Sequence, residues 1–296
     1  MAGSDHPVDD ISLTAERTIA MSILHAIVLG LTQGLSEFLP ISSSGHLILV
    51  PWLFGWHDFD DASVKKAFDV ALHIGTLVAA VAYFRHDLVR YVRDGIRAAL
   101  HPRQTPTADG RLAWLLVVSS IPAAIVGALF EGFIDDELGR IWLIAVSLIV
   151  FGVVLLWADR QHGRRTIDGY TMRDALIIGS GQVVALNPGT SRSGATITMG
   201  RLVGFDRDSA ARISFLMAIP VTAGAIVYKV GKLAADGIPS DLQGAMAVGI
   251  VTSAVSGWAA VWGTLRLVRT RSFAPFVVYR VALGLAVLVL LATSFR

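Results

Sequence analysis

Long stretches without ionisable side chains constrain this chain more than any other feature. Leu112–Phe130, Ile141–Ala158 and Leu242–Leu265 contain no Asp, Glu, Lys or Arg, and the same holds for 213–228 and 281–295. About 20 apolar residues suffice to cross a bilayer. The chain is 54% hydrophobic and only 16% charged, against about 25% charged residues in a soluble domain. The pattern excludes a soluble enzyme, a disordered chain and a single-anchor protein, and it lacks the alternating segments of an outer-membrane barrel. It predicts an all-α polytopic membrane protein.

Charge and cysteine content narrow the chemistry. The formal net charge is only +2, so nothing favours a nucleic-acid partner. Because the chain has no Cys, disulfides, thiol catalysis and thiolate metal sites are excluded. Residues 1–17 are polar and partly acidic, without the basic n-region of a signal peptide. We expect a flexible N-terminal tail over 1–17, followed by one integral membrane domain over 18–296.

Two apolar segments are interrupted by short polar breaks. Pro40 and a serine run separate apolar arms at 18–39 and 41–56, and a second proline-containing break separates arms at 174–186 and 193–204. Polar backbone at membrane depth is tolerated only inside protein or beside water, so each pair of arms is expected to form a re-entrant hairpin. Six transmembrane helices then remain, at 69–86, 111–130, 139–158, 210–230, 242–265 and 275–294.

The loops differ in charge. Arginines concentrate in the loops 85–111, 159–173 and 266–271, whereas the 131–140 loop is acidic. Positive loops remain in the cytoplasm, so the acidic loop and both termini are expected outside.

The order of elements indicates an inverted repeat. Each hairpin precedes three spans, and three is odd, so the halves 18–158 and 174–296 must have opposite orientations. Laid without gaps, Gln33–Gly45 and Gln182–Gly194 share a Gln, two Ser and a Gly. Inverted repeats commonly build a polar site where broken helices meet near the midplane.

The first break carries ionisable groups. Gln33 and Glu37 share one helix face, Pro40 ends that helix, and His46 opens the next one. An intramembrane Glu or His is a functional candidate by default. Glu37 as an ion-paired structural carboxylate and His46 as a packed core residue remain the alternatives. The intervening residues offer hydroxyl groups or close backbone approach, or they serve as helix caps: Ser42, Ser43, Ser44 and Gly45.

The second break has the composition of a phosphate cradle. Arg192 lies between two apolar arms, where an unpaired cation is costly. Hydroxyl groups, glycines and a helix N-terminus surround it, contributed by Gly189, Thr190, Ser191, Ser193 and Gly194. The alternative is a salt bridge from Arg192 to Glu37, which would still place Arg192 beside the site.

Other polar residues within the spans are less informative. Asp69 and His73 share one helix face, where helix-end or packing roles are expected. Arg212 and Arg280 lie near span ends, and we expect their side chains to snorkel toward the membrane surface.

At its two breaks the chain resembles the bacterial undecaprenyl-diphosphate phosphatase family of the bacitracin-resistance type. The motifs are EFLPISSSGH and PGTSRSGAT, and further blocks such as FDVALHIGTL and SFAPFVVYR extend the resemblance through nearly the whole chain after residue 20. The resemblance implies removal of the terminal phosphate from a C55 isoprenyl diphosphate. The family does this with a divalent cation on the outer side of the cytoplasmic membrane, recycling the lipid carrier of cell-wall synthesis.

The resemblance and the residues together assign expected roles. Glu37, assisted by Gln33, is the expected ligand set for Mg²⁺ or Ca²⁺, and Arg192 is expected to hold a phosphoryl group. His46 is the expected base or nucleophile, with Ser43 as the alternative nucleophile and His46 as its base. The substrate-binding residues are Ser42, Ser44, Gly45, Thr190, Ser191, Ser193 and Gly194.

Partners and a rival function follow from the same features. The expected partners are a polyprenyl diphosphate and the surrounding membrane lipid, and homodimerisation is left open. A lipid-phosphate flippase is the rival function, since transporters also use paired re-entrant hairpins.

Overall fold

The described part of the chain consists mainly of helices. A computed structural model describes residues 21–58, 62–236, 242–293 and 295. These residues form α-helices α1 to α12 and one short 3₁₀ turn, η1 (Ile167–Gly169), without a β-strand. The tail expected over 1–17 lies outside the described residues.

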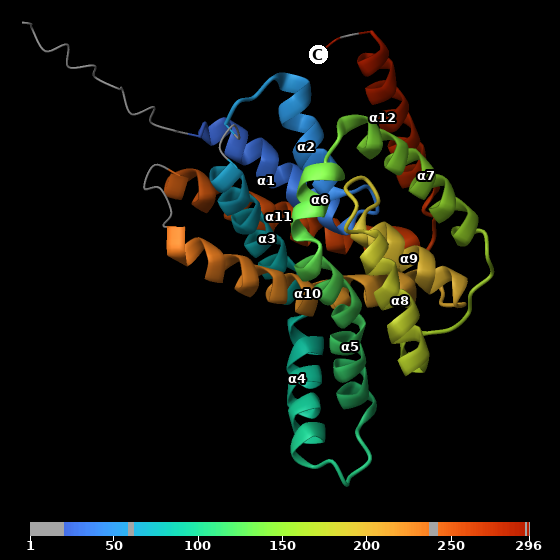
Figure 1. Ribbon diagram of the computed structural model, residues 1–296. Helices are drawn as coiled ribbons and strands as arrows, with labels where there is room; N and C mark the ends of the chain where they lie inside the picture. The colour runs from blue at the N-terminus through green and yellow to red at the C-terminus, as the bar shows by residue number, and fades with distance from the viewer. Residues whose placement is uncertain (1–20, 59–61, 237–241, 294, 296) are drawn as a thin grey trace, which may run out of the picture.

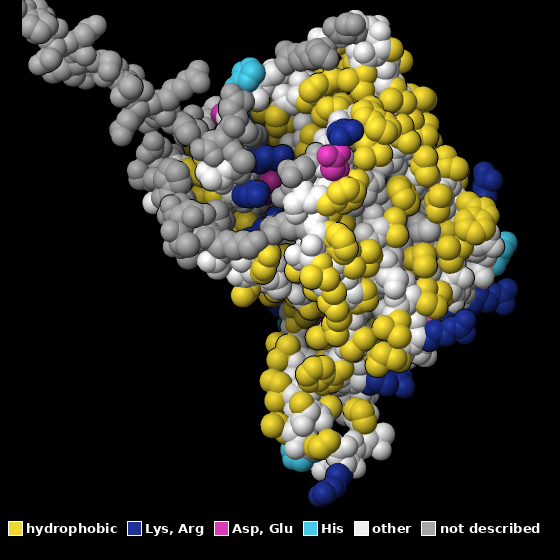
Figure 2. Space-filling model, in the orientation of Figure 1, with side chains coloured by type: hydrophobic (Ala, Val, Ile, Leu, Met, Phe, Trp, Pro, Cys, Tyr) yellow, Lys and Arg dark blue, Asp and Glu magenta, His cyan; other side chains and the backbone are white. Residues whose placement is uncertain are grey.

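Six helices are long and apolar enough to cross a bilayer, as the sequence predicts. Their outer faces carry exposed Trp, Leu and Val side chains, and Figure 2 shows apolar side chains over wide areas of one face of the molecule. The chain is therefore a multi-pass membrane protein. The spanning helices are α3 (Ala62–Tyr83), α5 (Ala108–Leu129), α7 (Ile141–Asp159), α10 (Arg207–Asp236), α11 (Gln243–Val268) and α12 (Ala274–Ala292).

Four shorter helices flank the two polar breaks. They are α1 (Ile23–Phe38), α2 (Ser43–Phe54), α8 (Met172–Val184) and α9 (Arg192–Leu202). The longest has 16 residues, or about 24 Å at 1.5 Å per residue, which is less than the ~30 Å hydrocarbon core. None of the four arms can cross the bilayer alone.

Two helices occupy segments that were expected to be loops. The Arg-rich loop 85–111 contains α4 (Arg85–Leu100), and the acidic loop contains α6 (Glu131–Glu137). Figure 1 shows α4 beside the lower part of α5, projecting together from the rest of the molecule. The many arginines of this segment favoured a loop in the sequence. In the structure they alternate with an exposed apolar stripe, as in an amphipathic helix, and this stripe includes Val89, Val92 and Ile96.

Helices from the two halves of the chain pack against each other. The first arm α1 lies along α11, α8 lies along α5, and α7 pairs with α12. Glycines allow the close approach. A Cβ at Gly34 would lie 2.0 Å from Ser256 Oγ, and one at Gly179 would lie 2.4 Å from the Ser119 carbonyl oxygen. The first arm of each half therefore packs against a span of the other half. This exchange of arms brings the two breaks together at the centre of the molecule.

Candidate active site

The two breaks have the same local backbone. Ser42 and Ser191 have φ values of 79° and 76°, and they are the non-glycine residues of positive φ in the described chain. Each caps the following helix: Ser42 Oγ accepts from the Gly45 N–H at 3.3 Å, and Ser191 Oγ accepts from the Gly194 N–H at 3.1 Å. Left-handed backbone at a non-glycine residue is strained, and such residues cluster at functional sites.

Hydrogen bonds connect one break to the other. The Gly189 N–H donates to Ser42 Oγ at 3.0 Å, and Ser193 Oγ donates to the Leu39 carbonyl oxygen at 3.0 Å. Gly189 has a φ of +92°, and a Cβ there would lie 2.6 Å from the Ile144 carbonyl oxygen, so only glycine fits. Ser42 and Ser193 therefore hold the breaks in register.

Glu37 is the centre of the polar cluster. Its Oε1 accepts from Arg192 Nη2 at 2.8 Å, and its Oε2 accepts from Ser43 Oγ at 2.5 Å and from Gln33 Nε2 at 3.2 Å. The Glu37 and Arg192 side chains are 7% and 17% exposed. The salt bridge considered from the sequence thus exists, and it places Arg192 beside Ser43. A narrow cleft next to the pair is also lined by Thr76 and Thr222.

His46 faces away from this cluster. One ring nitrogen, Nδ1, lies 2.7 Å from the Ser42 carbonyl oxygen, and Nε2 lies 2.8 Å from the Tyr279 hydroxyl. A carbonyl oxygen only accepts, so Nδ1 carries a proton and donates it to the Ser42 carbonyl oxygen, while Nε2 forms its hydrogen bond with the Tyr279 hydroxyl. Ser43 hydrogen-bonds to Glu37, whereas both nitrogens of His46 have other partners. Tyr279 was not identified from the sequence, because only the folded chain brings α12 to α2.

The remaining expected substrate-binding residues border the cluster. Thr190 is fully buried and accepts from Asn187 Nδ2 at 3.1 Å, while Ser44 is exposed. A Cβ at Gly45 would lie 3.2 Å from Ser42 Oγ, and one at Gly194 would lie 2.9 Å from Arg280 Nη1. These glycines let the first turns of α2 and α9 approach the same space.

Arg280 does not snorkel, contrary to the expectation from its position. It is 0% exposed. Its guanidinium donates to the carbonyl oxygens of Pro40 at 3.1 Å, Gly189 at 3.0 Å, Thr190 at 2.9 Å and Leu148 at 3.1 Å. Carbonyl dipoles replace a carboxylate partner, so the cation can stay buried. Arg280 joins both breaks to α7. The available signal was its place in the SFAPFVVYR block.

The oxygen atoms of the cluster fit a divalent cation. Gln33 Oε1 is buried and has no hydrogen-bond partner, although the side chain lies beside the Glu37 carboxylate. The described residues contain no group of three or more His, Asp or Glu suited to a metal. Mg²⁺ commonly binds one or two protein carboxylates together with substrate phosphates and water. One carboxylate and one free amide oxygen match that mode of binding.

These features define a multi-pass membrane protein with a buried polar site suited to a phosphorylated ligand. Residues 26–286 match the family described as bacitracin resistance protein BacA. The undecaprenyl-diphosphatase of Pelobacter propionicus is 48% identical over 93% of this chain and 99% of its own length. Those of Geobacter sulfurreducens and Nocardioides sp. are 46% and 45% identical, over 90% and 93% of this chain and 98% of their own lengths. The chain belongs to the BacA family, as the resemblance of its motifs indicates.

Proposed function

We propose that this protein hydrolyses undecaprenyl diphosphate to undecaprenyl phosphate and inorganic phosphate. The activity would recycle the lipid carrier of cell-wall synthesis and support resistance to bacitracin. The observation that carries the proposal is the contact of Glu37 with both Ser43 and Arg192, from opposite breaks. The names of the relatives supply the substrate.

Arg192 and two helix N-termini bind the diphosphate. The guanidinium presents a planar fork that matches two phosphoryl oxygens. The first turns of α2 and α9 leave N–H groups without intrahelical partners, and these favour an anion. Both helices start at the breaks, at Ser43 and Arg192, so their N-termini and the guanidinium converge on one phosphoryl group.

Ser43 is the nucleophile in this proposal. Its Oγ attacks the terminal phosphorus, the bond from that phosphorus to the bridging oxygen breaks, and undecaprenyl phosphate leaves. Glu37 Oε2, already 2.5 Å from Ser43 Oγ, accepts the serine proton. Glu37 passes this proton to the departing undecaprenyl phosphate. Water then attacks the phosphoserine and gives a proton to Glu37, which returns it to Ser43 Oγ as the bond from phosphorus to Ser43 Oγ breaks, so inorganic phosphate is released and Ser43 is restored. Arg192 stabilises the charge that develops on the equatorial oxygens.

Glu37 and Gln33 would hold the divalent cation. The support is the unpaired Gln33 Oε1 beside the carboxylate. When bound, Mg²⁺ or Ca²⁺ would neutralise phosphate charge and polarise the phosphoryl group.

The proposed architecture is an inverted repeat with two re-entrant hairpins. Matching N-caps at Ser42 and Ser191, four arms too short to span and the exchange of arms between halves support it. We further propose that the protein lies in the bacterial cytoplasmic membrane with the acidic 131–140 loop outside, because the Arg-rich loops belong in the cytoplasm. The active site would then open to the extracytoplasmic side.

Phosphate release from purified, detergent-solubilised protein tests the function. We expect undecaprenyl diphosphate to yield inorganic phosphate, and a chelator to stop the reaction until Mg²⁺ or Ca²⁺ is restored. A Ser43→Ala variant purified in the same way is the control, since loss of its phosphate release excludes a contaminating phosphatase. Transfer of a lipid phosphate between leaflets of a vesicle, without phosphate release in the detergent assay, would identify a flippase instead.

A further inference from the structure

A second polar cavity lies at the opposite end of α9 from the active site. It has a volume of about 730 Å³ and lies where α7 and α11 end and α10 begins. From Arg192 to Arg201, α9 rises about 14 Å, and no active-site residue lines this cavity. Its lining consists of Asp159, Arg160, Gln161, His162, Gly163, Arg164, Arg201, Asp206, Arg207, Asp208, Val268 and Arg269.

The acidic residues of this cavity are already engaged. Asp159 accepts from Arg207 Nε at 2.6 Å and lies 3.6 Å from Arg201 Nε, so one carboxylate serves two guanidinium groups. Asp208 pairs with Arg269 at 3.2 Å. Asp206 accepts from the Ser209 N–H at 2.7 Å and so caps α10.

Positive charge is therefore left in surplus. Arg160 and Arg164 are exposed, and neither has a carboxylate partner among the described residues. Asp159 balances one of its two arginines. The cavity is lined by five arginines and three aspartates, so its lining carries a net positive charge of two, which favours an anion.

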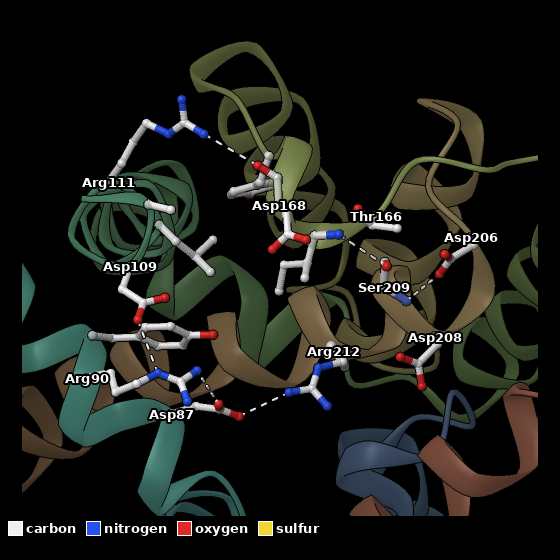
Figure 3. Close-up of a pocket in the computed structure, with 15 residues that line it drawn as sticks. Asp87, Arg90, Asp109, Arg111, Thr166, Asp168, Asp206, Asp208, Ser209 and Arg212 are labelled. Atoms are coloured by element: carbon white, nitrogen blue, oxygen red, sulfur yellow. Dashed lines mark hydrogen bonds and ion pairs between the residues drawn. The ribbon is translucent and has the colours of Figure 1, made fainter. Parts of the chain in front are cut away.

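The neighbouring pocket, drawn in Figure 3, has the opposite balance of charge, with more acidic than basic residues. Arg90 pairs there with Asp87 and Asp109, and Arg212 also pairs with Asp87. Asp206 and Asp208, at the N-terminus of α10, line both pockets. Because its acidic residues outnumber its three arginines, the pocket in Figure 3 repels an anion that the second cavity attracts.

The loop that carries Arg160, His162 and Arg164 is anchored to the rest of the chain. The Arg165 N–H donates to the Gly204 carbonyl oxygen and the Asp206 N–H donates to the Arg165 carbonyl oxygen, both at 2.9 Å. A Cβ at Gly163 would lie 2.1 Å from the Phe205 carbonyl oxygen, so glycine is required for this approach. Anchored groups lose less entropy when a ligand binds.

We propose that this cavity is a binding site for a phosphate-bearing anion. Guanidinium forks match phosphate oxygens in pairs. The phosphate is carried either by a soluble ion or by the headgroup of an anionic lipid. The site is separate from the active site, so it stands independently of the proposed reaction.

Single cysteines provide a local test, because the chain has no natural Cys. His162→Cys places a thiol in the cavity. Gly169→Cys is the control, since Gly169 is exposed and an added Cβ there meets nothing within 4 Å. Each thiol is modified with methanethiosulfonates carrying either a sulfonate or a trimethylammonium group. We expect the rate ratio of anionic to cationic reagent to be at least about tenfold higher at residue 162, and to fall to the control value with Arg160→Gln and Arg164→Gln.

Protection by phosphate identifies the ligand and its source. Inorganic phosphate should slow modification at residue 162 more than chloride of equal ionic strength, and the two Gln substitutions should abolish that difference. If only phosphatidylglycerol in nanodiscs protects, relative to phosphatidylcholine, the ligand is a lipid headgroup. Equal rate ratios at the two positions, or protection by neither phosphate nor phosphatidylglycerol, would overturn the proposal. Phosphate release by the double Gln variant should stay near wild type, which verifies its fold.

Discussion

Arg192 Nη2 and Glu37 Oε1 lie 2.8 Å apart, in an ion pair that joins the two broken segments of the chain. Each partner would be costly to bury alone, so the pair explains how both charges exist in a buried site. It also sets a requirement for the reaction. The guanidinium must share its donors between Glu37 and the incoming phosphate, or exchange one for the other.

Replacing Arg192 by lysine tests whether the planar fork is needed. Arg192→Lys keeps the positive charge but supplies a point charge on a flexible stem. We expect kcat to fall at least about 10²-fold, nearly as far as with Arg192→Ala, because one preorganised donor to developing charge is worth about 10²–10³ in rate. Steady-state phosphate release measures the effect. If the Lys variant retained more than about a tenth of wild-type kcat, Arg192 would act only as a positive charge that attracts anions.

Substitutions at Glu37 and at Gln33 should change the metal dependence of the activity in different ways. An ionised carboxylate attracts a divalent cation strongly, whereas an amide oxygen is a neutral ligand. We expect Glu37→Gln to abolish activity at any Mg²⁺ concentration, and Gln33→Ala to retain activity with a higher Mg²⁺ requirement. Titration of each variant with Mg²⁺ after chelation measures both. Unchanged Mg²⁺ dependence in Gln33→Ala would remove Gln33 from the ligand set.

Much of the fold and the composition of the site were predictable, because both depend on local sequence. The six spans follow from uncharged stretches, and Pro40 with the serine run locates the first break. Contacts that only the folded chain creates were not predictable. Arg280 donates to carbonyl groups of two distant segments, and Tyr279 reaches His46 across 233 positions. Neither contact leaves a periodic pattern in the sequence.

Arg280 should be required for a stable fold. Arg280→Met removes the donor to carbonyl oxygens of both breaks, and an unsatisfied buried polar group costs about 1–3 kcal/mol. Several groups are affected, so we expect a loss of at least about 3 kcal/mol and a lower midpoint of thermal unfolding in detergent. Arg271→Met, at an exposed position, is the matched control and should change stability by less than about 0.5 kcal/mol. Equal midpoints for the two variants would contradict the role of Arg280.

Introduced cysteines test the proposed inverted topology. Cys at Phe133 in α6 and at Thr293 after α12 should react with an impermeant reagent applied to intact cells. Cys at Arg97 and at Arg164 should react only after the membrane is opened. All four positions are exposed, so a difference in labelling reports the side of the membrane. External labelling at both residue 133 and residue 164, which only α7 separates, would be incompatible with three spans in each half.

The nucleophile is tested by comparing Ser43→Ala, His46→Ala and Tyr279→Phe. When several groups act as one catalytic unit, removing any one of them lowers the activity of the enzyme by a similar factor. If His46 were the base for Ser43, the two Ala variants would therefore be equally impaired. The geometry predicts unequal losses, because Ser43 donates to Glu37 while His46 bonds the Ser42 carbonyl oxygen and the Tyr279 hydroxyl.

We expect Ser43→Ala to lower kcat at least about 10³-fold, and His46→Ala to lower it much less by loosening the first break. Tyr279→Phe removes one hydrogen bond, worth about 1 kcal/mol, and should cost less than about tenfold. Rapid quenching of a single turnover with substrate labelled in its terminal phosphate adds a direct measurement. Label should appear on wild-type protein and on His46→Ala, and be absent from Ser43→Ala. Equal losses in the two Ala variants, with label retained on Ser43→Ala, would instead assign the attack to His46.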